Sequence, residues 1–309
     1  MNATSHDGKT AGRPQGPEDF RAIATGLGFT EGPVFMQDGT IVVTSIDRGH
    51  LYSVRDGEPP ELYAVTGGGP NGATEGPGGT LYVAQSPRKR GADVTGGVQL
   101  VHPTSPPAPG APYSIGAFVE NVNLDAVSPN DLCFGPDGVL WVTDPTRGIR
   151  HDSRIWQVDI ASREATLVAS TDYYANGIAF GLENDAIYVV STGTHQIFRY
   201  AIEGDHLGAR EVAVQLEDGH PDGFAFDVDG NFVIAVNADD PHSRGRIEVF
   251  DREGRRLDRF EPRGGQWFTN VAISADNRLI VTHPDQGAVL EARWPTAGLQ
   301  LHPFRSRGN

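Results

Sequence analysis

The sequence is poor in cysteine, methionine and positive charge. Its 309 residues include one cysteine and two methionines, so no intramolecular disulfide can form, and the apolar pattern around Cys133 predicts a buried, inert thiol. Lysine and arginine total 25 against 40 aspartates and glutamates, a formal net charge of −15. Such a field repels nucleic-acid phosphates and anionic lipids, so neither a nucleic acid nor a membrane is expected as a partner.

Long apolar stretches are also missing. No run approaches the length of a membrane span, and the residues from Met1 to Pro17 are polar and contain no apolar core of a signal peptide. We therefore expect a cytoplasmic protein with a flexible tail over residues 1–18 and a single domain over residues 19–309. Metalloprotease helices, serine elbows and phosphate-binding loops have no match either.

Turn-forming residues, in contrast, are abundant, with 39 glycines and 22 prolines. Six segments recur, each consisting of a short strand, an Asp-Gly-like turn and a second strand rich in β-branched and aromatic residues, which together indicate a hairpin. Their starts are 40 to 59 residues apart, close to the about 40 to 50 residues of a four-stranded propeller blade. The six starts are Glu31, Asn71, Asn130, Asn176, Asp222 and Asn270.

This repeat predicts an all-β protein, a six-bladed β-propeller with four-stranded antiparallel blades around a central channel. Ring closure should leave no exposed sheet edge, and residues 20–24 are suited to complete the last blade. The longest interval contains an insertion over residues 87–117, for which a lid, an interface or a solvated excursion all remain open.

The first residues of the six repeats should ring one mouth of the channel. They are two carboxylates and four carboxamides, without a lysine or an apolar side chain. Each alone could cap its own backbone, but together they converge without cationic partners, and their carboxylates would repel one another unless a cation lay among them. Ca²⁺, which takes six to eight oxygen ligands, is the expected ion, while Mg²⁺, Mn²⁺ and Zn²⁺ remain possible.

Four of the repeats carry short motifs at these positions. The motifs are Glu31-Gly32-Pro33, Pro129-Asn130-Asp131, Asn176-Gly177 and Pro221-Asp222-Gly223. With this order and spacing, residues 19 to 295 resemble the gluconolactonase and regucalcin (senescence marker protein) family, whose members are calcium-dependent six-bladed propellers.

The resemblance implies a metal bound by Glu31, Asn176 and Asp222, with Asn130 a further ligand or a catalytic substrate contact and Asp222 the general base. Sugar-lactone enzymes of the family carry an arginine two places before the asparagine that matches Asn130, whereas this chain has Ser128. That difference argues against a polyhydroxy sugar lactone as substrate.

The mechanism expected on this basis is metal-assisted opening of a lactone or ester, in which the ion polarises the carbonyl and Asp222 helps to deprotonate a water molecule. A calcium-dependent phosphotriesterase acting at the same site is one alternative. A non-catalytic, metal-stabilised binding module is another, because a fold does not determine a function. The oligomeric state is not predicted.

Residues near the ring supply the expected substrate contacts. Second strands return to the same mouth, and their last residues include Gln85 and His283. The residues before the ring positions are mostly apolar, and their aromatic rings could pack between blades or line a pocket, which favours a substrate less polar than a sugar lactone. The predicted substrate contacts are Asn71, Ser128, Tyr174, Trp267, Asn270, Gln85 and His283.

Overall fold

The computed structural model describes residues 14, 16, 19–87, 96–102, 119–145, 152–204 and 206–302, without the side chains of residues 119–125. Most of the expected tail over residues 1–18 therefore lies outside the described residues. The same is true of residues 88–95 and 103–118, which form most of the predicted insertion. The stretch between them, β8, is a regular strand of a blade, so the predicted insertion is not one continuous excursion.

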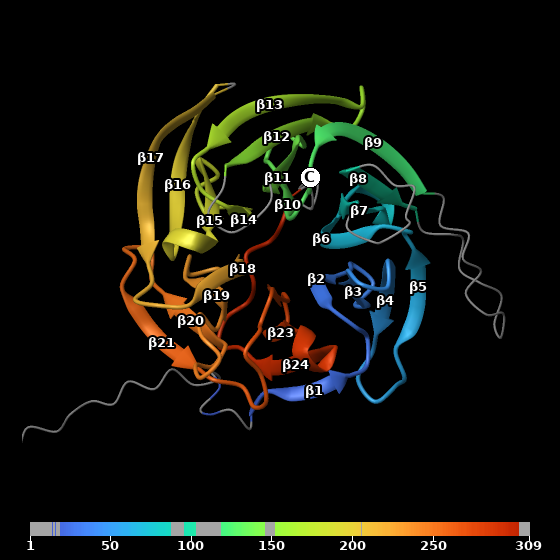
Figure 1. Cartoon of the computed structure of the whole chain (residues 1–309), viewed down its shortest axis with the longest axis vertical. Coiled ribbons are helices and arrows are strands. Elements are labelled where there is room, and N and C mark those ends of the chain that lie inside the picture. Colours follow the sequence, from blue (N-terminus) through green and yellow to red (C-terminus); the bar gives the residue numbers. More distant parts are fainter. Residues whose placement is uncertain are drawn as a thin grey trace, which may run out of the picture.

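Six four-stranded antiparallel sheets stand in a ring (Figure 1), which confirms the six-bladed β-propeller. Blade 1 contains β2 (Thr30–Phe35), β3 (Ile41–Ser45), β4 (His50–Val54) and β5 (Glu61–Val65). Blade 2 contains β6 (Gly69–Glu75), β7 (Leu81–Ser86), β8 (Gly96–Val101) and β9 (Val119–Ala126). Blade 3 contains β10 (Leu132–Phe134), β11 (Leu140–Pro145), β12 (Ser153–Asp159) and β13 (Glu164–Thr171).

The other three blades repeat this pattern. Blade 4 contains β14 (Ala175–Phe180), β15 (Ala186–Ser191), β16 (Gln196–Glu203) and β17 (His206–Gln215). Blade 5 contains β18 (His220–Phe226), β19 (Phe232–Asn237), β20 (Arg246–Phe250) and β21 (Arg256–Phe260). Blade 6 contains β22 (Val271–Ile273), β23 (Arg278–His283), β24 (Ala288–Arg293) and β1 (Arg21–Ala24).

In the part of the chain that the structure describes, the helical elements include short 3₁₀ turns over Pro77–Gly79, Thr192–Thr194 and Pro284–Gln286. Among the described residues, no helix is long and apolar enough to cross a membrane. Turns between first and second strands use left-handed residues, glycine at Gly39, Gly138 and Gly230 and asparagine at Asn184 and Asn277. Both residue types tolerate positive φ better than other side chains do, which explains the recurring Asp-Gly-like turns.

The hydrophobic core is divided into six clusters, one at each junction between neighbouring blades. Second strands are buried on both faces because each lies inside a blade that is covered by its two neighbours. Val83 of β7, Val142 of β11 and Ile234 of β19 have no exposed surface. Apolar burial on both faces, worth about 25 cal/mol per Å², therefore fixes the blades against one another and holds the inner strands around one axis.

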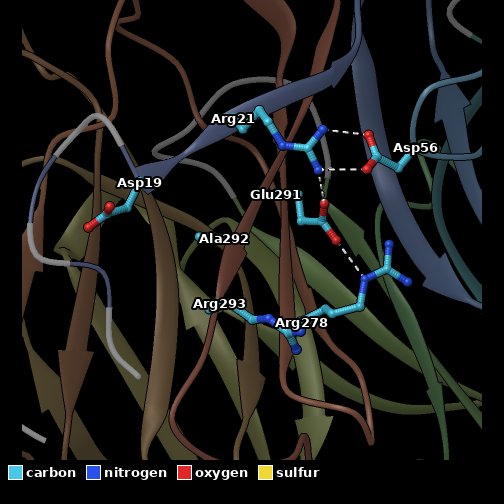
Figure 2. Close-up of a pocket in the computed structure, with 7 residues that line it drawn as sticks. All are labelled: Asp19, Arg21, Asp56, Arg278, Glu291, Ala292 and Arg293. Atoms are coloured by element: carbon cyan, nitrogen blue, oxygen red, sulfur yellow. Dashed lines mark hydrogen bonds and ion pairs between the residues drawn. The ribbon is translucent and has the colours of Figure 1, made fainter. Parts of the chain in front are cut away.

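Ring closure is confirmed, since β1 pairs with β24 in an antiparallel ladder that places Arg21 opposite Glu291. A surface hollow at this closing strand contains an ion-pair chain (Figure 2), in which Arg21 binds Asp56 of blade 1 at 2.5 Å and Glu291 at 2.7 Å. Glu291 also binds Arg278 at 2.5 Å. These ion pairs tie the closing strand to blade 1 and to β23.

The segment after β24, residues 295–302, runs across the ring and is called here the C-terminal strap (Figure 1). Gly298 bridges to Asp227 in blade 5, and His302 bridges to Phe134 in blade 3. His302 also contacts Asn184 of blade 4, with 2.7 Å between Nε2 and Oδ1. All three partners lie at or beside turns between first and second strands, so the strap crosses the face opposite the starts of the inner strands.

Candidate metal and catalytic site

The six predicted ring residues lie at the starts of the six inner strands. Each is buried, with an exposed fraction between 4% for Glu31 and 9% for Asp222, and neighbouring inner strands contact one another around the axis. The structure therefore brings all six together at one end of the channel, at equivalent positions of the six blades. The ring consists of Glu31, Asn71, Asn130, Asn176, Asp222 and Asn270.

A β-bulge with a glycine places the ring residue in four of the blades. The strand register shifts between Glu31 and Val34 and at the matching places in blades 2, 4 and 5. A Cβ atom on Gly32 would lie 2.4 Å from the backbone oxygen of Asn71, and one on Gly223 would lie 2.1 Å from the side chain of Asn270. Because neither space admits a Cβ atom, the Glu-Gly, Asn-Gly and Asp-Gly pairs reflect close approach between blades.

Threonine hydroxyls join neighbouring blades at the level of the ring. Oγ1 of Thr44 donates to the backbone oxygen of Asn71 in the next blade at 2.7 Å, and Oγ1 of Thr143 donates to that of Asn176 at 2.8 Å. Between the last blade and the first, Oγ1 of Thr269 donates to the backbone oxygen of Thr30, one residue before Glu31, at 2.8 Å. These bonds fix the height and spacing of the ring residues, since a buried carbonyl without a partner is costly.

The carboxamides of the ring are not equivalent. Asn270 uses both ends of its amide, because Oδ1 accepts from the backbone N–H of Val271 and Nδ2 donates to Oε2 of Glu31 at 3.3 Å. Asn176 donates from Nδ2 to Oγ1 of Thr192 at 3.1 Å. That contact turns the amide so that Oδ1 is the end available to a ligand. Asn176 is therefore better suited to bind a cation than Asn270.

Carboxyl groups lie close enough together at the ring to affect one another's ionisation. Burial raises the pKa of Glu31 well above its usual value, and the nearby carboxylates of Asp222 and Asp131 raise it further. The backbone N–H of Gly32 and the amide of Asn270 stabilise the charged form but do not outweigh the burial. Among the described residues, the main charged groups that act on Glu31 are thus other carboxylates and not basic side chains.

Asp131 is a third channel carboxylate that the sequence reasoning did not assign. Burial raises its pKa to about 6, although bonds from the backbone N–H of Leu132 and the amide of Asn270 favour its charged form. In the sequence, Asp131 occupies the place that glycine takes after the ring residue in blades 1, 2, 4 and 5. That exception to the repeat is the signal that could have revealed it.

A hard divalent cation fits these residues. Among the described residues, no three His, Cys, Asp or Glu side chains gather closely enough to hold a metal by themselves, so a site here needs carboxamide oxygens beside the carboxylates. Glu31, Asp222, Asn130 and Asn176 offer that combination. Mixed carboxylate and carboxamide oxygens are ligands that Ca²⁺ accepts readily, and a cation would relieve the repulsion that raises the pKa of Glu31.

The ends of the second strands hold the chain segments that lead into the ring. Asp144 accepts from the backbone N–H groups of Val127 and Ser128 at 3.0 and 2.6 Å and pairs with Arg154 at 2.7 Å. His283 contacts the backbone oxygen of Trp267 through Nδ1 at 3.0 Å.

Gln85 accepts from the backbone N–H groups of Gly68 and Gly69 at 2.8 and 3.0 Å in the amide orientation that satisfies both ends. Gln85 and His283 have no exposed surface. A direct contact with substrate, as the sequence predicts for both, would require the segments above them to move.

The five aromatic residues before the ring divide into core and surface. Tyr173 is buried and its hydroxyl lies 2.8 Å from that of Tyr200, while Phe268 is fully buried. Tyr174 is 7% exposed. Trp267, by contrast, is 44% exposed, and its ring meets the edge of Phe29 with 6.2 Å between centroids. Phe29 and Trp267 thus provide the accessible apolar surface, between blades 6 and 1.

The chain is similar in sequence to a known protein family and to several curated proteins. The pattern of the SMP-30/Gluconolactonase/LRE-like region matches residues 29–284. A 6-deoxy-6-sulfogluconolactonase from Pseudomonas putida is 27% identical over 169 residues, which are 52% of this chain and 54% of that protein. The matched stretches span about half the length of the curated relatives.

Solved structures show the same fold. A calcium-binding regucalcin from Agrobacterium tumefaciens superimposes with a TM-score of 0.73 at 18% identity, covering 93% of this chain and 97% of that one. A gluconolactonase from Xanthomonas campestris gives a TM-score of 0.68 at 21% identity, covering 89% and 90%. At these identities the likeness concerns the fold alone.

Proposed function

Because the chain belongs to the SMP-30/gluconolactonase/LRE-like family, we propose that it is a metal-dependent hydrolase that opens the ring of a lactone. The observation that carries the proposal is the buried pair of acidic residues, Glu31 and Asp222, which lies in a ring with four carboxamides and whose mutual repulsion raises the pKa of Glu31. A ring of this composition suits a cation, and the relatives named as lactonases give the chemistry its direction.

Glu31, Asn130, Asn176 and Asp222 would hold the ion, for which Ca²⁺ is the first choice and Mg²⁺, Mn²⁺ and Zn²⁺ are the alternatives. When bound, it would supply positive charge that polarises the ester carbonyl. Asn71 and Asn270 belong to the ring without this role. Asn270 instead orients Glu31 through its amide.

Asp222 acts as the general base. Its carboxylate accepts a proton from a water molecule while the water oxygen bonds to the carbonyl carbon, and the proton then passes to the ring oxygen as its bond to that carbon breaks. The product is one hydroxy acid, and the carboxylate is regenerated. Asn130 lies beside the reacting centre as a ligand or a contact to the substrate carbonyl.

The substrate is a lactone less polar than a sugar lactone. Ser128, where sugar-lactone enzymes of the family carry an arginine, is 8% exposed and bonds to Ser86 at 3.2 Å, so it offers little to a polyhydroxy ring. Trp267 and Phe29 offer apolar contact instead. An unpaired buried hydroxyl costs about 1 to 3 kcal/mol, whereas apolar contact gains about 25 cal/mol per Å².

Elemental analysis of the purified protein, combined with hydrolysis rates on a lactone panel, tests this function. We expect a stoichiometric divalent ion, activity that chelation abolishes and added Ca²⁺ restores, and a large loss of rate in Asp222→Asn. Glu164→Gln, on an exposed strand of blade 3, is the charge-neutralising control and should behave as wild type. Full activity after exhaustive metal removal would refute the metal-dependent mechanism.

A further inference from the structure

Asn237, at the end of β19, joins the proposed base to the chain segment of the next blade. Nδ2 of Asn237 donates to Oδ2 of Asp222 at 2.8 Å, and Oδ1 accepts from the backbone N–H of Phe268 at 2.8 Å. Asn237 is 6% exposed and Asp222 is 9% exposed. Both hydrogen bonds are therefore shielded from competing water.

The two contacts fix the orientation of the amide without ambiguity. The backbone N–H of Phe268 can only donate, so it must face the oxygen of the Asn237 side chain, and the amide nitrogen must then face Asp222. That nitrogen is a donor only, so the Asp222 oxygen it meets must be an acceptor. The contact therefore favours a charged carboxylate and fixes the direction in which it points.

The other end of Asn237 holds the segment that carries Trp267. Three further bonds fix this segment, since Oδ2 of Asp285 accepts from the backbone N–H groups of Gln266 and Trp267 at 2.7 and 3.1 Å, and the backbone oxygen of Trp267 contacts Nδ1 of His283 at 3.0 Å. Asp285 and His283 anchor the segment within blade 6. Asn237 alone of these anchors also touches a proposed catalytic residue.

We infer that Asn237 is a positioning residue, which orients the carboxylate of Asp222 for proton transfer and keeps it in register with the apolar surface at Trp267. This inference rests on the proposed function, because it concerns the same base and the same reaction. It adds a residue that links the reacting group in blade 5 to the substrate-facing rim in blade 6. The matching residue of blade 4, Ser191, bonds to Thr194 instead.

Two substitutions separate the two bonds. Asn237→Asp keeps an acceptor for Phe268 but has no donor for Asp222 and adds a like charge beside it. Asn237→Ala removes both contacts. Ser191→Ala, at the equivalent strand end where the hydroxyl bonds to Thr194, is the matched control and should keep wild-type kinetics.

Three measurements on each full-length variant test the inference. These are kcat and KM on γ-phenyl-γ-butyrolactone, Ca²⁺ affinity by titration calorimetry, and acrylamide quenching of tryptophan fluorescence. Quenching reports on Trp267, because the chain has four tryptophans and the other three, Trp141, Trp156 and Trp294, are buried.

We expect kcat to fall at least about tenfold in both Asn237 variants, with KM changed less than about threefold, because the lost contact acts on proton transfer rather than on substrate binding. Ca²⁺ affinity should stay within about threefold of wild type in Asn237→Ala, since Asp222 keeps its charge. Quenching should increase in Asn237→Ala and stay at the wild-type level in Asn237→Asp.

Wild-type kcat in both variants would overturn the positioning role while leaving Asp222 as the base. A loss of Ca²⁺ affinity as large as the loss of kcat would also overturn it, because Asn237 would then merely support the site. Full activity in Asp222→Asn would refute the base itself and the positioning role with it. The failure of the inference and that of the proposed function are therefore distinguishable.

Discussion

Thr192 accepts a hydrogen bond from the side-chain amide of Asn176 at 3.1 Å. Its own hydroxyl proton goes to the backbone oxygen of Pro221 at 2.9 Å, one residue before Asp222. One threonine therefore orients a proposed ligand in blade 4 and fixes the chain next to another in blade 5. The proposed cation site would therefore depend on Thr192 for the orientation of Asn176.

Thr192→Val should weaken Ca²⁺ binding about tenfold, because two bonds of about 0.5 to 1.5 kcal/mol each are lost while the volume is kept. Titration calorimetry measures the change. Thr194→Val, in the same 3₁₀ turn but exposed, should bind Ca²⁺ as wild type does. Equal affinity in the two variants would show that the orientation of Asn176 does not matter.

Removal of the metal should make stability depend on pH in a defined direction. Folding raises the pKa of Glu31 above 4.5 and that of Asp131 from 3.8 to about 6. A raised carboxyl pKa contributes stability that is complete below the unfolded value and is lost as pH rises through the folded value. The metal-free protein should therefore lose stability between about pH 4 and pH 7.

Bound Ca²⁺ should offset this loss, since an ion that binds only the native state stabilises it by about 2.7 kcal/mol at one hundred times its dissociation constant. The difference in Tm with and without Ca²⁺ should widen by several degrees from pH 5 to pH 7. Thermal scans with Ca²⁺ or with a chelator at each pH measure it. A constant or narrowing difference would contradict the burial and mutual repulsion of the channel carboxylates described above.

Glu31→Gln should raise the free energy of unfolding of the metal-free protein and lower that of the Ca²⁺-bound protein. Without metal, it removes a buried charge that faces like charges, and the amide oxygen can still accept from Gly32, so stability should rise by about 1 kcal/mol. With Ca²⁺, one ligand charge is lost and binding weakens. Asn71→Ala should have a milder effect on Ca²⁺ affinity, and an effect as large as that of Glu31→Gln would place Asn71 among the ligands.

Substrate preference should follow the apolar rim. We expect kcat/KM for γ-phenyl-γ-butyrolactone to exceed that for glucono-δ-lactone, and Trp267→Ala to narrow the ratio about threefold to tenfold, because up to about 1.4 kcal/mol of apolar contact is lost. Tyr173→Phe, a core change away from the rim, is the control. Faster turnover of glucono-δ-lactone by wild type would mean that Ser128 and Trp267 have been misinterpreted.

The sequence predicts the blades and the ring well because both repeat. Six hairpins at similar spacing require equivalent places for Glu31 and its counterparts, and closure by residues 20–24 follows from the need to cover a sheet edge. Asp131 was missed because it breaks the repeat. The repeat places Asn237 at the end of a second strand, but it does not predict the hydrogen bonds of Asn237 to Asp222 and Phe268, which join two blades.

For the aromatic residues before the ring, equivalent positions in the repeat do not predict equivalent burial. Tyr173 and Trp267 occupy similar places before a ring residue, yet one is 3% exposed and the other 44%. The hydroxyl of Tyr173 finds Tyr200 inside its own blade, whereas Trp267 lies at the junction with blade 1 beside Phe29. Hydrophobicity alone cannot separate these two environments, because both bury apolar area.

The closing blade meets blade 1 at a seam, where the last inner strand, β22, lies beside the first, β2. At its outer edge, Arg21 forms an ion pair with Asp56 of blade 1. At its inner edge, hydrogen bonds join Thr269 to Thr30 and Asn270 to Glu31. The inner edge thus includes a proposed metal ligand. An ion bound in the channel would therefore stabilise the contact between blades 6 and 1 and, through it, the closed ring. Backbone amide hydrogen exchange in β1 and β24, which lie far from the site, should slow when the ion binds.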